Sequence, residues 1–233
     1  MYYLCIKELT MDFQLSFKVS EKIYLKDPSQ SAIGKSIVQQ GIKMIHELGF
    51  ESFTFKKLAQ EVEITEATVY RYFENKHRLL LYILNWYWSY LEFMVMFKIQ
   101  NLGDAREKLD SIIELLTTKL PAQSGGIDFD QNLLYEIVVA ESSKTFLIKD
   151  VNEINKHQVF KPYKDLCQAI AEVIIEIDSC YPYPHSLAST LVETAHSQQY
   201  FISHLPRLTD ADNHDATSYT LSYLRDLIHK VLK

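Results

Sequence analysis

The sequence predicts an all-helical protein, and three observations carry this prediction. Only six glycines and six prolines occur in 233 residues, so few positions interrupt regular structure. Apolar residues recur at the three- and four-residue spacing of amphipathic helices through most of the chain, whereas strand-like alternation is scarce. Apolar residues make up 47% of the chain at a mean hydropathy of -0.11, which indicates a soluble globular protein with a sizeable core.

Charge is divided unevenly along the chain. The formal net charge is -6, yet residues 31–80 carry seven Lys and Arg against six Glu. Residues 81–233 carry 13 basic and 20 acidic side chains, and an acidic body disfavours non-specific adhesion to nucleic acid. Three cysteines, Cys5, Cys167 and Cys180, form no metal-spaced pair and are odd in number. With no secretory signal in the first 30 residues, they predict a cytoplasmic protein with reduced thiols.

Residues 1–26 are expected to form an extended arm. Apolar residues alternate with polar ones at Phe13, Leu15, Phe17 and Val19, which suits a strand that pairs with residues 22–25 or with a second subunit. Met11 is an alternative start of the protein, in which case residues 1–10 lie upstream of it.

A first helix is expected to run from Asp27 to Leu48. Asp27 suits an N-cap, Pro28 the first helical position and Gln30 the third position after the cap. Gly49 is expected to end this helix, because glycine is the residue favoured just after a helix C-terminus.

Two short helices are expected next, at about residues 54–62 and 65–71. Thr54 and Thr65 suit their N-caps, and apolar residues follow each threonine at helical spacing. Two short helices that cross at such a turn form a helix-turn-helix, whose second helix can lie in a DNA major groove. Asn75 is expected to cap a third, longer helix that begins at Lys76.

The stretch from about residue 35 to residue 80 resembles the tetracycline-repressor (TetR) family of bacterial regulators. The resemblance rests chiefly on the end of the second short helix and on the start of the long one: Tyr70, Tyr72, Phe73, Lys76, Leu79 and Leu80. Glu63 stands where the family usually has glycine, and a left-handed backbone there costs Glu roughly 1 kcal/mol relative to glycine. The resemblance implies a DNA-binding domain at residues 27–75 and a ligand-binding and dimerisation domain at residues 76–233.

The same resemblance implies which residues meet DNA. Hydroxyl groups and a lysine fall where family members touch phosphates: Thr54, Thr68, Tyr70, Tyr72 and Lys76. Thr65 is also expected among the DNA-binding residues. Lys56 is expected to add a phosphate or base contact. Base edges are expected to meet Glu66, Ala67 and Arg71, since Arg71 can fork onto guanine and Ala67 can touch a thymine methyl group. For Glu66 an ordinary first-turn acid, favoured by the helix dipole, is an equal alternative.

The long helix becomes strongly apolar between Leu79 and Phe97. Its polar residues Asn85, Ser89 and Glu92 share one stripe, which argues against a membrane span and predicts a solvent-facing or interhelical edge. Its aromatic side chains suit a core. The resemblance also implies a pocket for a small apolar or amphipathic molecule beside this helix, with the following candidate residues: Trp86, Ser89, Tyr90, Phe93, Phe97 and Tyr135.

Five further helices are expected. Their ranges are about 104–119, 130–146, 150–179 with a break or kink at Pro162, 186–204 and 214–232. The resemblance implies that the last two form a homodimer interface, although packing within one chain explains their apolar spacing equally well.

These observations predict a sequence-specific DNA-binding transcriptional regulator, in which a homodimer acts on a near-palindromic operator as a ligand-responsive repressor. The eight histidines are dispersed, and no glycine-rich loop or nucleophile motif occurs, so no catalytic residue, cofactor or metal site is expected. The alternative is a helical dimeric interaction module with an idle DNA-binding head, which Glu63 and the weak basicity of residues 31–80 support.

Overall fold

The computed structural model describes residue 17 and residues 19–118, 130–211 and 215–232. All regular structure in these residues is helical, which confirms the all-α fold class. The strand expected in the arm lies mostly on residues that the structure does not describe, and residues 21–26 form turns and bends. Phe13 and Leu15 lie outside the described residues.

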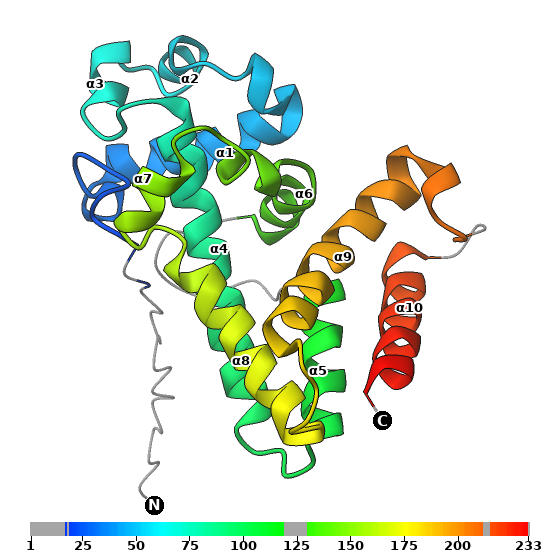
Figure 1. Ribbon diagram of the computed structural model, residues 1–233. Helices are drawn as coiled ribbons and strands as arrows, with labels where there is room; N and C mark the ends of the chain where they lie inside the picture. The colour runs from blue at the N-terminus through cyan, green and yellow to red at the C-terminus, as the bar shows by residue number, and fades with distance from the viewer. Residues whose placement is uncertain (1–16, 18, 119–129, 212–214, 233) are drawn as a thin grey trace, which may run out of the picture.

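The N-terminal helices form a head of three helices: α1 (Ala32–Ser52), α2 (Phe55–Glu61) and α3 (Glu66–Tyr70) (Figure 1). Its core is built from apolar side chains that recur at helical spacing, with Ile37, Leu58 and Val69 fully buried. The head thus has its own small core, on which the two short helices rest.

The start of α1 differs from the expectation. Asp27 caps a separate 3₁₀ helix, η1 (Pro28–Gln30), and the N-cap of α1 is Ser31, whose Oγ accepts from Gly34 N–H at 3.1 Å. Gly49 was expected to end the helix, and it does leave helical geometry, with φ of 73° and ψ of 154°. The chain resumes helical turns after this break as far as Ser52.

The body is organised around α4 (Lys76–Ile99), which passes from the head into the body (Figure 1). α4 packs against α5 (Ala105–Thr117) and α8 (Lys161–Ile177), and α9 (Pro184–His204) packs against both α8 and α5. α10 (Ala216–Val231) rests on α9 and α5. α6 (Gln131–Glu141) instead packs against α1 of the head.

Three body elements differ from the expected ranges. The helix expected at 130–146 ends at Glu141 and continues as a 3₁₀ turn, η2 (Ser142–Thr145). Residues 150–179 form two helices, α7 (Val151–Lys156) and α8, with Pro162 in the first turn of α8, where proline removes no helical hydrogen bond. Pro184 likewise begins α9, which therefore starts two residues earlier than expected.

The polar stripe of α4 faces inward more than expected. Asn85 is buried, and its Nδ2 donates to the Leu81 carbonyl at 2.9 Å. Ser89 and Glu92 are half-buried, and burial raises the pKa of the Glu92 carboxyl. The stripe is therefore an interhelical edge rather than a solvent-facing one.

Candidate nucleic-acid interface

Threonine caps fix the two short helices of the head. Thr54 Oγ1 accepts from Lys57 N–H at 3.3 Å at the start of α2, and Thr65 Oγ1 accepts from Thr68 N–H at 3.2 Å at the start of α3. Both caps were expected. Glu63 in the turn between the helices has φ of 57°, so this position keeps the left-handed backbone for which glycine is better suited.

One face of the head exposes most of the side chains expected to meet DNA: Thr54, Lys56, Thr65, Glu66, Ala67, Tyr70 and Arg71. Tyr70 is 47% exposed, and its ring packs edge-on against Phe55 at 5.1 Å between centroids. Thr68 is half-buried, and its hydroxyl lies 2.9 Å from that of Thr65. Hydroxyl, cationic and small apolar groups are therefore gathered over α2 and α3.

The basic residues of this face are available to an anion. Within the described part of the chain, Lys56 and Arg71 form no ion pair, although the chain as a whole is acidic. Arg71 lies at the C-terminal end of α3, where its five-donor guanidinium is exposed. Such unpaired cations supply the long-range attraction and the phosphate contacts that nucleic-acid binding requires.

Lys76 does not lie on the exposed face. Its Nζ donates to the carbonyls of Phe50, Glu51 and Phe53 at 2.8, 3.0 and 3.2 Å, which uses all three of its donors. The ammonium group thereby holds the start of α4 against the end of α1. An anion at this helix start would meet the N-terminal end of α4 rather than the Lys76 ammonium.

Tyr72 is also drawn inward. Its side chain is only 3% exposed, and its hydroxyl lies 2.8 Å from Ser31 Oγ. Hydrogen bonding to Ser31, together with the nearby Lys26, lowers the pKa of Tyr72. This geometry favours a role for Tyr72 in positioning α3, and leaves little of its surface for a phosphate.

Polar contacts join the head to the body beside the break in α1. Because Gly49 interrupts the helix, Phe50 N–H is released from the helical ladder, and it donates to Glu141 Oε1 of α6 at 3.0 Å. Lys144 Nζ lies 2.7 Å from Glu141 Oε2 and 3.2 Å from Glu51 Oε1. His46 Nε2 lies 2.6 Å from Glu136 Oε2. The role of Glu141 in this contact was not predicted from the sequence. The one indication was an acidic residue at the end of an otherwise apolar helix.

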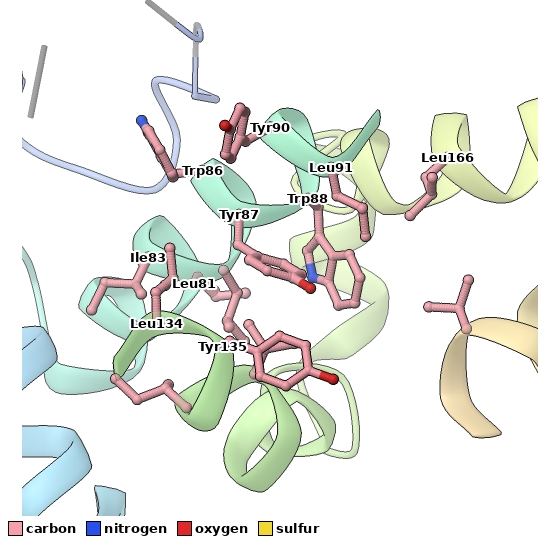
Figure 2. Close-up of a cluster of buried hydrophobic side chains, with 14 of the residues drawn as sticks. Leu81, Ile83, Trp86, Tyr87, Trp88, Tyr90, Leu91, Leu134, Tyr135 and Leu166 are labelled. Atoms are coloured by element: carbon pink, nitrogen blue, oxygen red, sulfur yellow. The ribbon is translucent and has the colours of Figure 1, made fainter. Parts of the chain in front are cut away.

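The structure brings four of the six candidate ligand-binding residues close together and places Tyr135 apart from them: Trp86 contacts Tyr90, and Phe93 contacts Phe97, with ring centroids 5.6 and 6.1 Å apart. Trp86 and Tyr90 leave α4 on the side opposite to Tyr87 and Tyr135 (Figure 2). Trp86, Tyr90 and Phe93 pack around Phe17 of the arm, with ring centroids 5.8, 6.0 and 6.0 Å away. Phe97 is 60% exposed, and Ser89 is half-buried. Phe17 thus occupies the space among Trp86, Tyr90 and Phe93, whereas Tyr135 lies on the other side of α4.

A cleft lies at the junction of the head and the body. It has a volume of about 680 Å³ and is bounded by α1, α6, α9 and the start of α10. Of the six candidates only Tyr135 lines it, together with His46, Gly49, Glu141 and Gln199. The cleft thus touches the residues at which the two domains meet.

A buried histidine lies next to Tyr135, surrounded by aromatic rings. His196 of α9 is 3% exposed, and the ring centroids of Tyr87, Trp88 and Tyr135 lie 6.4, 5.5 and 6.2 Å from its own. Neither ring nitrogen of His196 has a hydrogen-bond partner in the described residues, and the Tyr87 hydroxyl has none either. Burial lowers the pKa of His196 to about 4.

The family model described as "Bacterial regulatory proteins, tetR family" matches residues 37–83. This match covers the head and the first turns of α4. No curated protein matches the sequence. Among the described residues, none of the helices combines the length and the hydropathy that crossing a bilayer requires.

Solved structures of regulators share the fold over most of the chain. A putative transcriptional regulator from Saccharomonospora viridis, solved with choline, has a TM-score of 0.61 at 17% identity, and the alignment covers 85% of this chain and 97% of that one. FadR, a fatty acid degradation regulator from Bacillus halodurans, has a TM-score of 0.57 at 16% identity, covering 85% and 98%. AibR, solved with isovaleryl coenzyme A and operator DNA, has a TM-score of 0.56 at 14% identity, covering 86% and 97%. At these identities the likeness shows the fold alone.

Proposed function

This chain belongs to the tetR family of bacterial regulatory proteins through its N-terminal domain, and we propose that it is a ligand-responsive repressor that binds a near-palindromic operator as a homodimer. The observation that carries the proposal is the exposed face of α2 and α3, where unpaired Lys56 and Arg71 stand among threonine hydroxyls. As such a regulator, the protein is proposed to act in the cytoplasm and to carry out no catalysis.

We assign the contacts of the head by geometry. Arg71, Ala67 and Glu66 are exposed on α3 and read base edges, because α3 is the helix that enters the major groove. Hydroxyl groups at the two helix starts and on Tyr70 hold phosphates, with Lys56 adding charge. Lys76 and Tyr72 act from behind this face: one fixes α4 against α1, and the other fixes the end of α3.

The domain boundary is proposed between the head at residues 27–75 and the body at residues 76–233, with α4 as the connecting helix. For the dimer we propose a four-helix contact that α9 and α10 make with their copies. Tyr223 on α10 is 39% exposed, and Leu205 and Leu208 beyond the end of α9 are 46% and 57% exposed. Exposed apolar side chains on or beside both helices are consistent with a protein–protein contact there.

For the ligand we propose the cleft at the head–body junction. Its volume of about 680 Å³ lies in the range of roughly 300–1,000 Å³ that is usual for small-molecule sites. Its walls mix Ile45, Ile137 and Tyr135 with polar groups, which suits an amphipathic molecule. A ligand there contacts both domains, so its affinity differs between two head positions, as a population shift requires.

The DNA-binding part of the proposal is tested by removing one cation at a time. Arg71→Ala should weaken binding to the selected operator by roughly tenfold to a hundredfold and relax base preference at one position, since a bidentate arginine–guanine contact is worth about 1–3 kcal/mol. Arg106→Ala removes the same charge from an exposed position of α5 and should leave binding unchanged. Equal losses on operator and random DNA for Arg71→Ala would remove this residue from base reading.

The ligand part is tested by filling the cleft. Ser203→Trp places a large ring at the lining of the cleft, and should leave operator binding intact while abolishing its release by ligand. Ser186→Trp, at an exposed position in the first turn of the same helix, is the matched control. Normal release by the Ser203→Trp protein would place the ligand elsewhere in the body.

A further inference from the structure

The segment formed by Phe17 and residues 19–26, here called the strap, runs beside α4 and α7 before it enters the head (Figure 1). It has no regular secondary structure, yet it is well packed. Val19 and Ile23 are 4% and 1% exposed, so the strap contributes to the apolar core rather than lying free in solvent. The buried side chains of Val19 and Ile23 hold this irregular segment against the rest of the protein.

One end of the strap is bound to the body. The ring of Phe17 sits among Trp86, Tyr90 and Phe93 of α4, with edge-on or tilted geometry at 5.8–6.0 Å. Ser20 Oγ donates to the carbonyl of His157, between α7 and α8, at 3.4 Å. Edge-on aromatic contacts are among the more favourable arrangements of such rings.

The other end of the strap is bound to Tyr72, which lies just beyond α3, the helix proposed to enter the major groove. Leu25 N–H donates to the carbonyl of Tyr72 at 2.8 Å, and Lys26 Nζ lies 5.1 Å from the centroid of the Tyr72 ring. Tyr72 is two residues beyond the end of α3, and its hydroxyl is held by Ser31. The backbone of the strap therefore reaches the C-terminal end of α3 directly.

We propose that the strap is a positioning element, which ties α3 to the middle of α4 and thereby sets the orientation of the head for DNA. The chain itself joins these two points through the short connection from Tyr72 to Asn75, which leads into α4. Together with the contacts that α1 makes with α6 and with Lys76, the strap restricts rotation of the head about that connection. The inference rests on the proposed DNA-binding function, because an orientation matters only if α3 must enter a groove.

Two features beside the strap weaken its attachment to the body. A hollow of about 400 Å³ lies beside the strap, lined by Ser20, Lys22, Asn85, His157 and Lys161. Asn85 Oδ1 is buried with no hydrogen-bond partner in the described residues. An incompletely filled contact and an unsatisfied acceptor both weaken docking, so the docked fraction is open to change by substitution.

The protein contains its own reporter of docking. It has two tryptophans, and Trp86 is 5% exposed beneath Phe17, whereas Trp88 packs against Tyr163 on the other side of α4. In a Trp88→Phe background, the emission of Trp86 shifts to longer wavelength and becomes more accessible to iodide when the strap leaves α4. This readout needs no DNA, so it separates the strap from the proposed function.

The test uses variants at both ends of the strap. Phe17→Ala removes the body attachment, and Leu25→Pro removes the N–H that binds Tyr72. Leu25→Ala is the control, because the Leu25 side chain is 68% exposed and the N–H is kept. Phe17→Ala should expose Trp86, and both strap variants should lower operator affinity by about tenfold, equivalent to about 1.4 kcal/mol. The control should do neither.

Each other outcome has a definite meaning. Unchanged Trp86 emission in the Phe17→Ala protein would show that the strap is not held by this ring, and would overturn the proposal. Exposed Trp86 with operator affinity within twofold of the parent would show that docking has no positioning role. If the parent protein binds no DNA while Phe17→Ala still exposes Trp86, the DNA-binding function fails and the positioning role falls with it, leaving only the docking contact.

Discussion

Replacement of His196 by leucine should remove a large part of the acid sensitivity of the folded protein. His196 is 3% exposed among three aromatic rings, and burial lowers its pKa to about 4, against about 6.5 for an unperturbed histidine. The folded state therefore binds its proton less readily than the unfolded state. For a group whose folded pKa is depressed, the stabilisation is complete above the unfolded pKa and is lost as the pH falls toward the folded pKa.

The expected size follows from the two pKa values. A difference of about 2.5 pKa units at about 1.36 kcal/mol each corresponds to about 3 kcal/mol, most of it lost between about pH 7.5 and about pH 4.5. Carboxylates add their own acid sensitivity, so the informative quantity is the difference between the parent and His196→Leu. Near neutral pH the variant should be as stable as the parent or more stable, because the ring nitrogens of His196 have no partner in the described residues.

Urea unfolding at fixed protein concentration, measured across this pH range, gives the required free energies. His229→Gln is the control, because it removes an exposed histidine at the end of α10 instead of a buried one. Parallel pH profiles for the parent and His196→Leu would refute the reasoning, since they would mean that the buried ring is protonated as easily as in the unfolded chain.

Three further substitutions are expected to act as follows. Glu63→Gly should raise the free energy of unfolding by roughly 1 kcal/mol, measured by urea unfolding, because φ at this position is 57°. Glu141→Leu should lower it by roughly 1–3 kcal/mol by leaving Phe50 N–H without its acceptor, whereas Glu141→Gln should cost less. Tyr223→Glu should shift the protein toward monomer in sedimentation experiments, with loss of operator binding; an unchanged dimer would place the interface elsewhere.

Local signals in the sequence predicted the head well. The caps Thr54 and Thr65, the break at Gly49 and the left-handed turn at Glu63 depend on a few neighbouring residues, and each has the expected backbone in the structure. Helix boundaries in the body were predicted less well. Pro162 and Pro184 can stop a helix or begin one, and only packing of the surrounding residues decides which.

The surroundings of the α4 side chains could not be predicted from helical periodicity alone. The apolar run of α4 indicated burial, but not which neighbour covers each side: Trp86 faces the strap, whereas Tyr87 faces Tyr135. The inward turn of Lys76 was equally hidden, because its three acceptors lie more than twenty residues away in the chain. Contacts between distant segments thus account for most of what the sequence analysis missed.

The central claim is that the exposed face of α2 and α3 reads DNA, and selection from a pool of random duplex DNA tests it most directly. The purified parent protein should enrich a near-palindromic sequence, and its affinity should fall steeply with salt as phosphate contacts are screened. The same selection with Arg71→Ala should give a weaker motif that is degenerate at one position in each half-site. A folded parent dimer that enriches no sequence even at low salt would contradict the account, and would favour a helical interaction module with an idle head.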